Sequence, residues 1–215
     1  MKDTILVICA HPDDEILGAG GTIAKYAQEG KDVITIIFSD GEASHWWLKE
    51  KYTKEMRQKE CLEAGKVVGT KDTIFLGLTD LKLSEAIKDK KTIRKLKALI
   101  KKYDPKRIFT HSPDDAVYQD HVAVHNAVMM ALKNSKYKGD VYMFNVWGKD
   151  IRLLKNPKLY VDIKDTFKLK RQALSKFKSQ TLALLQLMPT VYYKAIRYGH
   201  ENRTRFAERF IKMEL

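Results

Sequence analysis

Short apolar runs alternate along this chain with longer stretches whose apolar residues recur at helical spacing. A continuous, β-branched run is typical of a strand buried on both faces, and Thr4–Ala10 is the clearest example. Further runs predict strands at Val33–Ser39, Thr73–Leu76, Arg107–His111 and Val141–Asn145, and an edge strand at Leu159–Ile163. The remaining stretches predict helices at Gly18–Gln28, at Leu48–Val68, from a Ser84 cap to Asp104, at Asp120–Leu132, and over most of the C-terminal third.

Strand and helix in alternation require crossover connections, which predict a parallel sheet with helices on both faces. The expected fold class is therefore α/β: a single-domain, Rossmann-like three-layer sandwich with a mostly parallel sheet. Because the sequence holds no Pro/Gly/Ser-rich linker, low-complexity tract or repeat, residues 1–215 are expected to form one domain. Ligands of such sheets bind beyond the carboxyl ends of the strands, so a site is expected in the segments that follow them.

The composition excludes several classes of protein. Lys and Arg outnumber Asp and Glu by 40 to 27, a net charge of +13, but only nine of the basic residues are Arg and no nucleic-acid-binding module is recognisable. We therefore expect a solvated, lysine-rich surface and no nucleic-acid partner. Cys9 and Cys61 are too few and too far apart for a disulfide framework or a thiolate zinc site. The apolar runs are too short for a signal peptide or a membrane span, so the expected location is the cytoplasm.

The first predicted strand ends in an unusual segment, His-Pro-Asp-Asp-Glu at residues 11–15, followed by glycines at 18, 20 and 21. The glycines lack the GxGxxG spacing of a dinucleotide site, and three carboxylates would repel a pyrophosphate. Alone, the acidic run also suits a charged helix N-terminus. With its histidine, however, it offers the nitrogen and oxygen ligands that a divalent metal requires.

A second acidic and histidine-containing segment follows the strand at Arg107–His111. It contains Asp114-Asp115 and, at the start of the next predicted helix, Asp120-His121. A catalytic zinc needs three protein ligands and one position open to water. Because the carboxyl ends of parallel strands meet at one edge of the sheet, we expect His121 to approach His11 and Asp14 and to complete a metal site.

The sequence resembles the PIG-L/LmbE family of zinc-dependent N-acetylglucosaminyl deacetylases. The residues that carry this resemblance are Ala10–Glu15 and, further along the chain, Asp120-His121. Weaker similarities follow in the family's order: Arg57 to Glu60, Ser179-Gln180, and Ala207–Phe210. The resemblance appears over nearly the whole chain. It implies the α/β fold and one Zn²⁺ per chain, with a small-molecule N-acetyl sugar as the partner; a homo-oligomer is left open.

The resemblance also implies roles for individual residues. His11, Asp14 and His121 would be the zinc ligands, Asp13 the general base, Arg57 a substrate contact, and Asp120 a catalytic group beside the ligands. One position departs from the family, since Tyr118 stands where a histidine often steadies the oxyanion. A phenol can donate that hydrogen bond but cannot act as a cationic acid near neutral pH, so proton delivery to the leaving amine would pass to Asp13.

The function that we expect is hydrolysis of the acetyl group from an N-acetylglucosamine-containing small molecule or glycoconjugate, by water activated at the metal. An alternative is another metal-dependent hydrolase such as a phosphoesterase, which would use two metals. Its second metal would require spare carboxylates, for which the candidates are Asp40, Glu42, Asp114 and Asp115. The least favoured alternative is a basic nucleic-acid-binding module without a metal. The pair Trp46-Trp47 fits either sugar stacking or plain packing.

Overall fold

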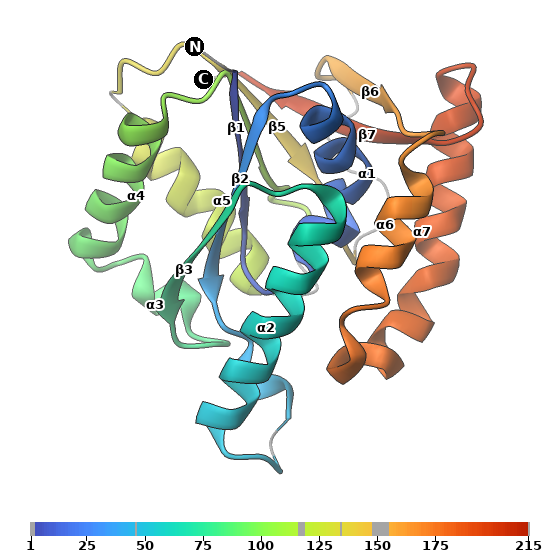
Figure 1. The fold of residues 1–215 in the computed structure, drawn as a ribbon. Helices are drawn as coiled ribbons and strands as arrows, with labels where there is room; N and C mark the ends of the chain where they lie inside the picture. The colour runs from blue at the N-terminus through green and yellow to red at the C-terminus, as the bar shows by residue number, and fades with distance from the viewer. Residues whose placement is uncertain (1–2, 46, 116–118, 134, 148–154, 215) are drawn as a thin grey trace.

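A seven-stranded sheet runs through the middle of the molecule in the order β3-β2-β1-β4-β5-β7-β6 (Figure 1). The computed structural model describes residues 3–45, 47–115, 119–133, 135–147 and 155–214. The strands from β1 to β5 run parallel to one another, whereas β7 is antiparallel to both β5 and β6. The strands are β1 (Thr4–Cys9), β2 (Asp32–Ser39), β3 (Asp72–Leu78), β4 (Arg107–His111), β5 (Asp140–Phe144), β6 (Lys158–Asp162) and β7 (Ala207–Met213).

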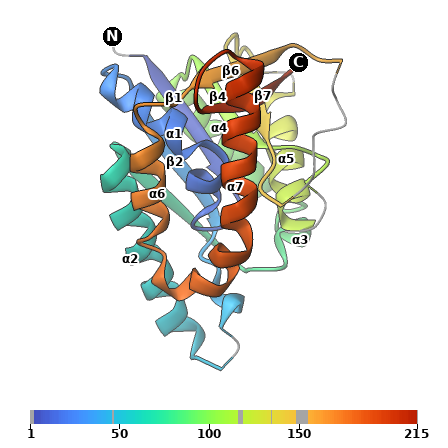
Figure 2. The same cartoon turned by 90° about the vertical axis from the view of Figure 1, so that its right-hand side faces the viewer.

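Helices cover both faces of this sheet, as expected for a three-layer sandwich. On one face lie α1 (Asp14–Gln28), α2 (Glu50–Val68), α6 (Phe167–Leu174) and α7 (Thr181–Glu201), which Figure 2 shows from the front. On the other face lie α3 (Leu83–Ala86), α4 (Lys90–Tyr103) and α5 (Gln119–Leu132). Two short 3₁₀ turns, η1 (Glu42–Ser44) and η2 (Lys178–Gln180), precede α2 and α7. Within the described ranges, no helix is both long and apolar enough to cross a bilayer.

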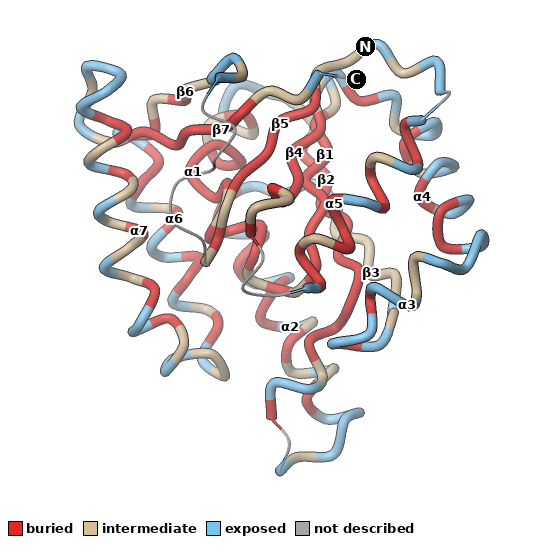
Figure 3. The backbone as a smooth tube through the Cα atoms, turned by 180° about the vertical axis from the view of Figure 1, so that it is seen from behind, coloured by how far each residue is buried: buried red, intermediate tan, exposed pale blue. Residues whose placement is uncertain are grey.

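Alternation along β1 explains why both faces are covered. Ile5, Val7 and Cys9 belong to the apolar core beneath α1, while Leu6 and Ile8 belong to the core beneath α5. Successive strand side chains point to opposite faces, so a strand that is apolar at every position needs a helical layer on each side. Figure 3 shows the result, with the strands buried and the outer sides of α4 and α7 exposed.

Two glycines let α1 lie close to the sheet. A Cβ at Gly18 would come within 2.3 Å of the Phe144 ring, and one at Gly21 within 2.8 Å of Ile163. A larger residue at either place would push α1 away from β5 and from the segment after β6. Because Asp14 begins this helix, the glycines help to set the position of the site.

The predicted α/β fold is confirmed, and Leu159–Ile163 does mark the strand at one edge. Three details of the prediction were wrong. The helix expected at Gly18 begins at Asp14, and the helix expected from Ser84 is two helices, of which α4 is capped by the Asp89 side chain. The C-terminal third, which was expected to be mostly helical, also contains β7, a strand that lies between β5 and β6 and pairs with both. The apolar and charged residues of β7 do not alternate clearly enough to predict a strand.

Chain connections change direction across the sheet between β1 and β4. From β1 the chain continues to β2 and β3 on one side, and later to β4 and β5 on the other. Loops that leave the two adjacent strands therefore diverge, and the gap between them is the usual ligand site of such sheets. Residues 10–13 follow β1 and residues 112–115 follow β4, so both predicted metal-binding segments lie at this point.

Candidate metal centre

A cavity of about 260 Å³ opens at the carboxyl ends of β1 and β4. Polar side chains from loops and helices line it, namely His11, Asp13, Asp14, Ser44, Arg57, Asp80, His121 and Gln180. The structure thus brings together at one cavity all three predicted metal ligands, the predicted base and the predicted substrate contact.

His11, Asp14 and His121 converge as a candidate ligand set. Ligand atoms of the three lie within 4.8 Å of one another. Asp14 stands between the two rings: its Oδ2 is 3.5 Å from Nδ1 of His11, and its Oδ1 is 3.4 Å from Nε2 of His121. His11 follows β1, Asp14 begins α1, and His121 lies in the first turn of α5, so three elements hold the set in place.

The second nitrogen of each ring contacts a carboxylate. Nδ1 of His121 lies 2.8 Å from Oδ2 of Asp115, and Nε2 of His11 lies 2.9 Å from Asp80 and 3.4 Å from Asp120. Such partners fix which nitrogen carries the proton and leave the other nitrogen for a metal. Two imidazoles and one carboxylate, with a second carboxylate at the far nitrogen of each ring, are a donor set that fits a catalytic zinc.

Backbone N–H groups fix these outer carboxylates. Asp115 accepts hydrogen bonds from the N–H groups of Val146, at 2.9 Å, and Trp147, at 3.1 Å, just after β5. Asp120 accepts from Leu81 at 2.8 Å and from Leu83 at 3.2 Å, after β3. The loops that follow β3 and β5 thus support the ligands that follow β1 and β4.

The charges of this cluster depend on one another. Burial would raise the pKa of Asp14, but His121 and His111 hold it well below its ordinary value. Burial would likewise lower the pKa of His121, but Asp14 and Asp115 raise it to about 9. His111 takes part as well, since its ring stacks on that of His121 with centroids 4.0 Å apart. A metal that binds this set must displace protons from the histidines.

Asp13 lies beside this set and is not part of it. Its backbone has a φ of 114°, in the left-handed region, and its N–H donates a 3.0 Å hydrogen bond to Glu15. Nη2 of Arg57 lies 3.4 Å from Oδ2 of Asp13. Burial raises the pKa of Asp13 to about 6, although Arg57 lowers it. A carboxylate with such a pKa is ionised at neutral pH and can still accept a proton, as a general base must.

Arg57 lies on α2 and also donates a 2.5 Å hydrogen bond to the carbonyl of Pro12, which fixes the turn that carries Asp13. Three residues on, Glu60 accepts hydrogen bonds from the backbone N–H and the hydroxyl of Ser179, at 2.9 and 2.6 Å. Two of the weaker sequence similarities are therefore in direct contact. Their contact holds η2, and with it Gln180, at the edge of the cavity.

Sequence reasoning missed two residues of the site. Asp80 was not singled out, although it comes soon after β3 and could have been found by inspecting every strand end. Asp115 was considered only as a ligand for a second metal, whereas it binds the ring of His121. Of the other spare carboxylates, Asp40 contacts Lys54 and Gln58, and Glu42 accepts from the N–H of Asp80.

Some sequence predictions concern residues that the structure leaves out or places elsewhere. Tyr118 and Trp46 lie outside the described residues. Trp47 is exposed, packs edge-on against His45, and is absent from the described lining of the cavity. His125 is buried, and its Nδ1 contacts the carbonyl oxygen of His111 at 3.0 Å, so it is a packed histidine.

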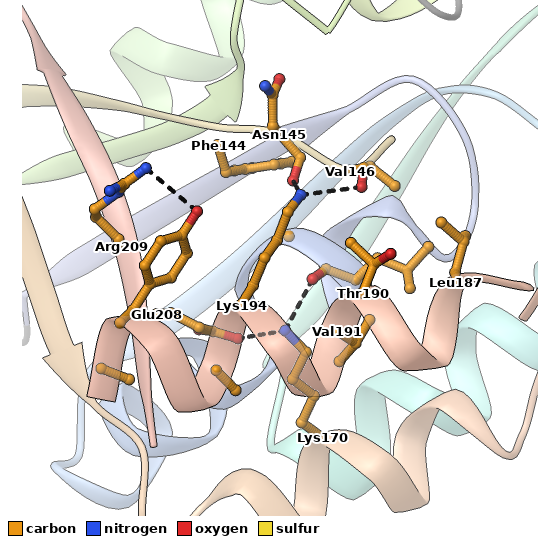
Figure 4. A pocket seen from close by; sticks show the side chains of 15 residues that line it. Phe144, Asn145, Val146, Lys170, Leu187, Thr190, Val191, Lys194, Glu208 and Arg209 are labelled. Atoms are coloured by element: carbon orange, nitrogen blue, oxygen red, sulfur yellow. Dashed lines mark hydrogen bonds and ion pairs between the residues drawn. The ribbon is translucent and has the colours of Figure 1, made fainter. Parts of the chain in front are cut away.

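A second, smaller cavity of about 40 Å³ lies between α1, α7 and the ends of β5 and β7 (Figure 4). Lys170 donates to the Leu17 carbonyl at 2.8 Å and pairs with Glu208 at 2.7 Å. Lys194 donates to the carbonyls of Asn145 and Val146. This space holds little more than water, and its two lysines tie structural elements together.

Several known proteins have sequences related to this chain. The profile of the PIG-L family, described as GlcNAc-PI de-N-acetylase, matches residues 6–132. A probable N-acetyl-alpha-D-glucosaminyl L-malate deacetylase 2 of Bacillus cereus is 29% identical over 193 residues, covering 86% of this chain and 87% of that protein. A 4-oxalmesaconate hydratase of Pseudomonas putida is 30% identical over 134 residues, covering 59% of this chain and 50% of that protein.

Solved structures show the same fold. The N,N'-diacetylchitobiose deacetylase of Pyrococcus horikoshii superposes with a TM-score of 0.80, covering 98% of this chain and 84% of that one, at 23% identity. The family profile spans more than half of the chain, and it includes both predicted metal-binding segments. The resemblance seen in the sequence is thus confirmed, and the chain belongs to the PIG-L deacetylase family.

Proposed function

We propose that this protein hydrolyses the acetyl group from an N-acetylglucosamine-containing small molecule, with one Zn²⁺ held by His11, Asp14 and His121. The observation that carries the proposal is the convergence of these three side chains, with a carboxylate behind each ring. The deacetylases among the relatives support the substrate class. A zinc ion in this position would polarise the amide carbonyl and lower the pKa of a water molecule to about 7.

Asp13 would move the proton. It lies at the cavity next to the ligand set, and a pKa of about 6 leaves it ionised when substrate binds at neutral pH. It takes a proton from the attacking water and returns it to the amine nitrogen, which leaves only when protonated. Acetate and the free amino sugar are the products. Arg57 keeps Asp13 in position and faces the same cavity, where a sugar hydroxyl would bind.

Two further residues complete the proposal. Asp120 fixes the ring of His11 and joins the loop after β3 to α5, so it acts by positioning a ligand. Tyr118, which precedes the ligand histidine by three residues, would donate its hydroxyl hydrogen to the oxyanion.

Metal analysis combined with an acetate-release assay tests the proposal. We expect one zinc per chain, and acetate released from N-acetylglucosamine conjugates at a rate that falls when the zinc is chelated. Two metal ions per chain together with phosphate release from a phosphoester would contradict it and favour the phosphoesterase alternative.

Substitution of the two adjacent aspartates separates ligand from base. Asp13→Asn should retain the zinc and lose turnover by about 10²-fold or more, whereas Asp14→Asn and His121→Ala should lose the zinc first. A metal-free Asp13→Asn protein would make Asp13 a ligand and contradict the assigned roles.

Hydration of an unsaturated carboxylic acid is a second candidate, because a 4-oxalmesaconate hydratase is among the relatives. The same residues could place water against a carbon–carbon double bond instead of an amide. Assays with 4-oxalmesaconate beside the N-acetyl sugars distinguish the two reactions. Loss of the unsaturated acid without any acetate release would favour the hydratase.

A further inference from the structure

Leu81 combines two features that are seldom found together at one leucine. Its backbone has a φ of 59°, in the left-handed region, where a bulky residue is a genuine outlier. Its side chain is 64% exposed, yet it lines the cavity that contains the candidate metal ligands.

The backbone conformation has a structural cause. The N–H of Leu81 donates to Oδ2 of Asp120 at 2.8 Å and to Oδ1 of Asp80 at 3.0 Å. These are the two carboxylates that contact Nε2 of His11. The turn after β3 must therefore direct this N–H inward, and the left-handed conformation achieves it.

Among the residues that the structure describes, nothing comparable accounts for a leucine side chain at this position. Glycine would adopt the same φ without strain, and asparagine adopts it more easily than leucine. A leucine here strains the backbone and gains little from packing, because most of its surface faces solvent. Strain of this kind is stored at functional sites. A bound molecule that covers the side chain would supply the missing apolar contact.

The surroundings of Leu81 indicate what kind of molecule that is. Apart from His11 and Asp13, the exposed and half-buried residues of the described lining are uncharged: Ala43, Ser44, Leu81, Trp147 and Gln180. Arg57 is the single Lys or Arg among the described lining residues, and it already contacts Pro12 and Asp13. The positive charges that give the chain its net +13 are thus not concentrated among the described residues that line this cavity.

We propose that Leu81 determines substrate specificity by contacting the aglycone, the group attached to the N-acetyl sugar, and that this aglycone is uncharged and has an apolar face. The inference rests on the proposed deacetylase function and adds the class of conjugate. The C–H face of a second sugar ring has this chemistry, whereas a dicarboxylate such as malate does not.

Steady-state kinetics with three substrates test the proposal: N-acetylglucosamine, which has no aglycone, N,N'-diacetylchitobiose, which has a neutral one, and N-acetylglucosaminyl malate, which has an anionic one. For the wild-type protein we expect kcat/KM to be highest with chitobiose. Leu81→Asn keeps the left-handed turn without the apolar surface, and should lower kcat/KM for chitobiose about tenfold while leaving that for N-acetylglucosamine within about twofold.

Two further variants serve as controls. Leu81→Met retains an apolar side chain and should keep the preference for chitobiose. Leu185→Asn removes a leucine of similar exposure, 65%, on α7, and should leave all three values unchanged. Equal melting temperatures across the set would show that the variants fold alike.

Several outcomes would overturn the inference. A wild-type protein that prefers the malate conjugate would contradict the inference. So would a Leu81→Asn protein that loses activity equally with all three substrates, or that loses none with chitobiose. In each of these cases the release of acetate would still support the proposed function. A zinc-loaded wild-type protein that releases acetate from none of the three contradicts the proposed function, and this inference with it.

Discussion

Nδ1 of His121 lies 2.8 Å from Oδ2 of Asp115, and both side chains are buried. This contact determines which nitrogen of the ring faces Asp14 and the cavity. Asp115 itself accepts hydrogen bonds from the backbone N–H groups of Val146 and Trp147, just after β5, so the orientation of the His121 ring is tied to the end of this strand.

Loss of this contact should weaken metal binding. Because outer carboxylates orient and polarise a ligand histidine, we expect Asp115→Asn to bind zinc about 10- to 100-fold more weakly, measured by competition with a chromophoric chelator. The neighbouring Asp114→Asn is the matched control, since that side chain is only half-buried, and its affinity should equal that of the wild type. Equal affinities in the two variants would show that Asp115 does not support the metal.

The pH profile should report the environment of Asp13. In the proposed mechanism Asp13 acts as a base in its ionised form, so kcat/KM should fall as the pH drops through about 6. Arg57 lowers the pKa of Asp13, so Arg57→Met should move this acidic limb to higher pH, in addition to raising KM. Arg94→Met, at an exposed position on α4, should leave the profile unchanged. A limb that stays in place in Arg57→Met would separate Arg57 from the ionisation of Asp13.

The hydroxyl of Tyr118 should matter for the chemical step more than for binding. Tyr118→Phe removes the proposed donor to the oxyanion, and we expect kcat to fall by about 10²-fold with little change in KM. Tyr142→Phe is a suitable control, because that hydroxyl contacts Asp140, at the start of β5 and far from its carboxyl end. An unchanged kcat in Tyr118→Phe would exclude the tyrosine from the reaction.

The buried pair Lys170–Glu208 should be important for stability. Lys170→Met leaves the Glu208 carboxylate buried without its cation, which we expect to cost about 3–5 kcal/mol in the free energy of unfolding. Lys212→Met breaks an exposed pair with Asp140 and should cost about 1 kcal/mol or less. Denaturant unfolding of both variants gives the comparison. A similar small loss in both would mean that Glu208 is satisfied by the N–H groups of Gly21 and Thr22 alone.

The sequence predicted the parallel core and the proximity of the three candidate ligands, because apolar runs identify buried strands and the residues just after them share one edge. Of the carboxylates that contact those histidines, the resemblance pointed to Asp120 beside the ligands, but the sequence did not reveal the contacts of the other two. Asp80 and Asp115 act through contacts with His11 and His121 that join different loops, and no local pattern encodes such contacts. The place of β7 was equally hidden, because its position between β5 and β6 depends on pairing across the whole chain.

The attachment of α1 to β7 has a consequence for the order in which the protein is assembled. Glu208 binds the N–H of Gly21, 187 residues earlier in the chain, on the helix that begins with Asp14. During synthesis, that helix leaves the ribosome long before the strand that secures it. Contacts between such distant residues form slowly. Until β7 joins the sheet, α1 is held by its contacts with β1, β2, α2 and α6, and the hydrogen bonds from its N–H groups to Glu208 are added last.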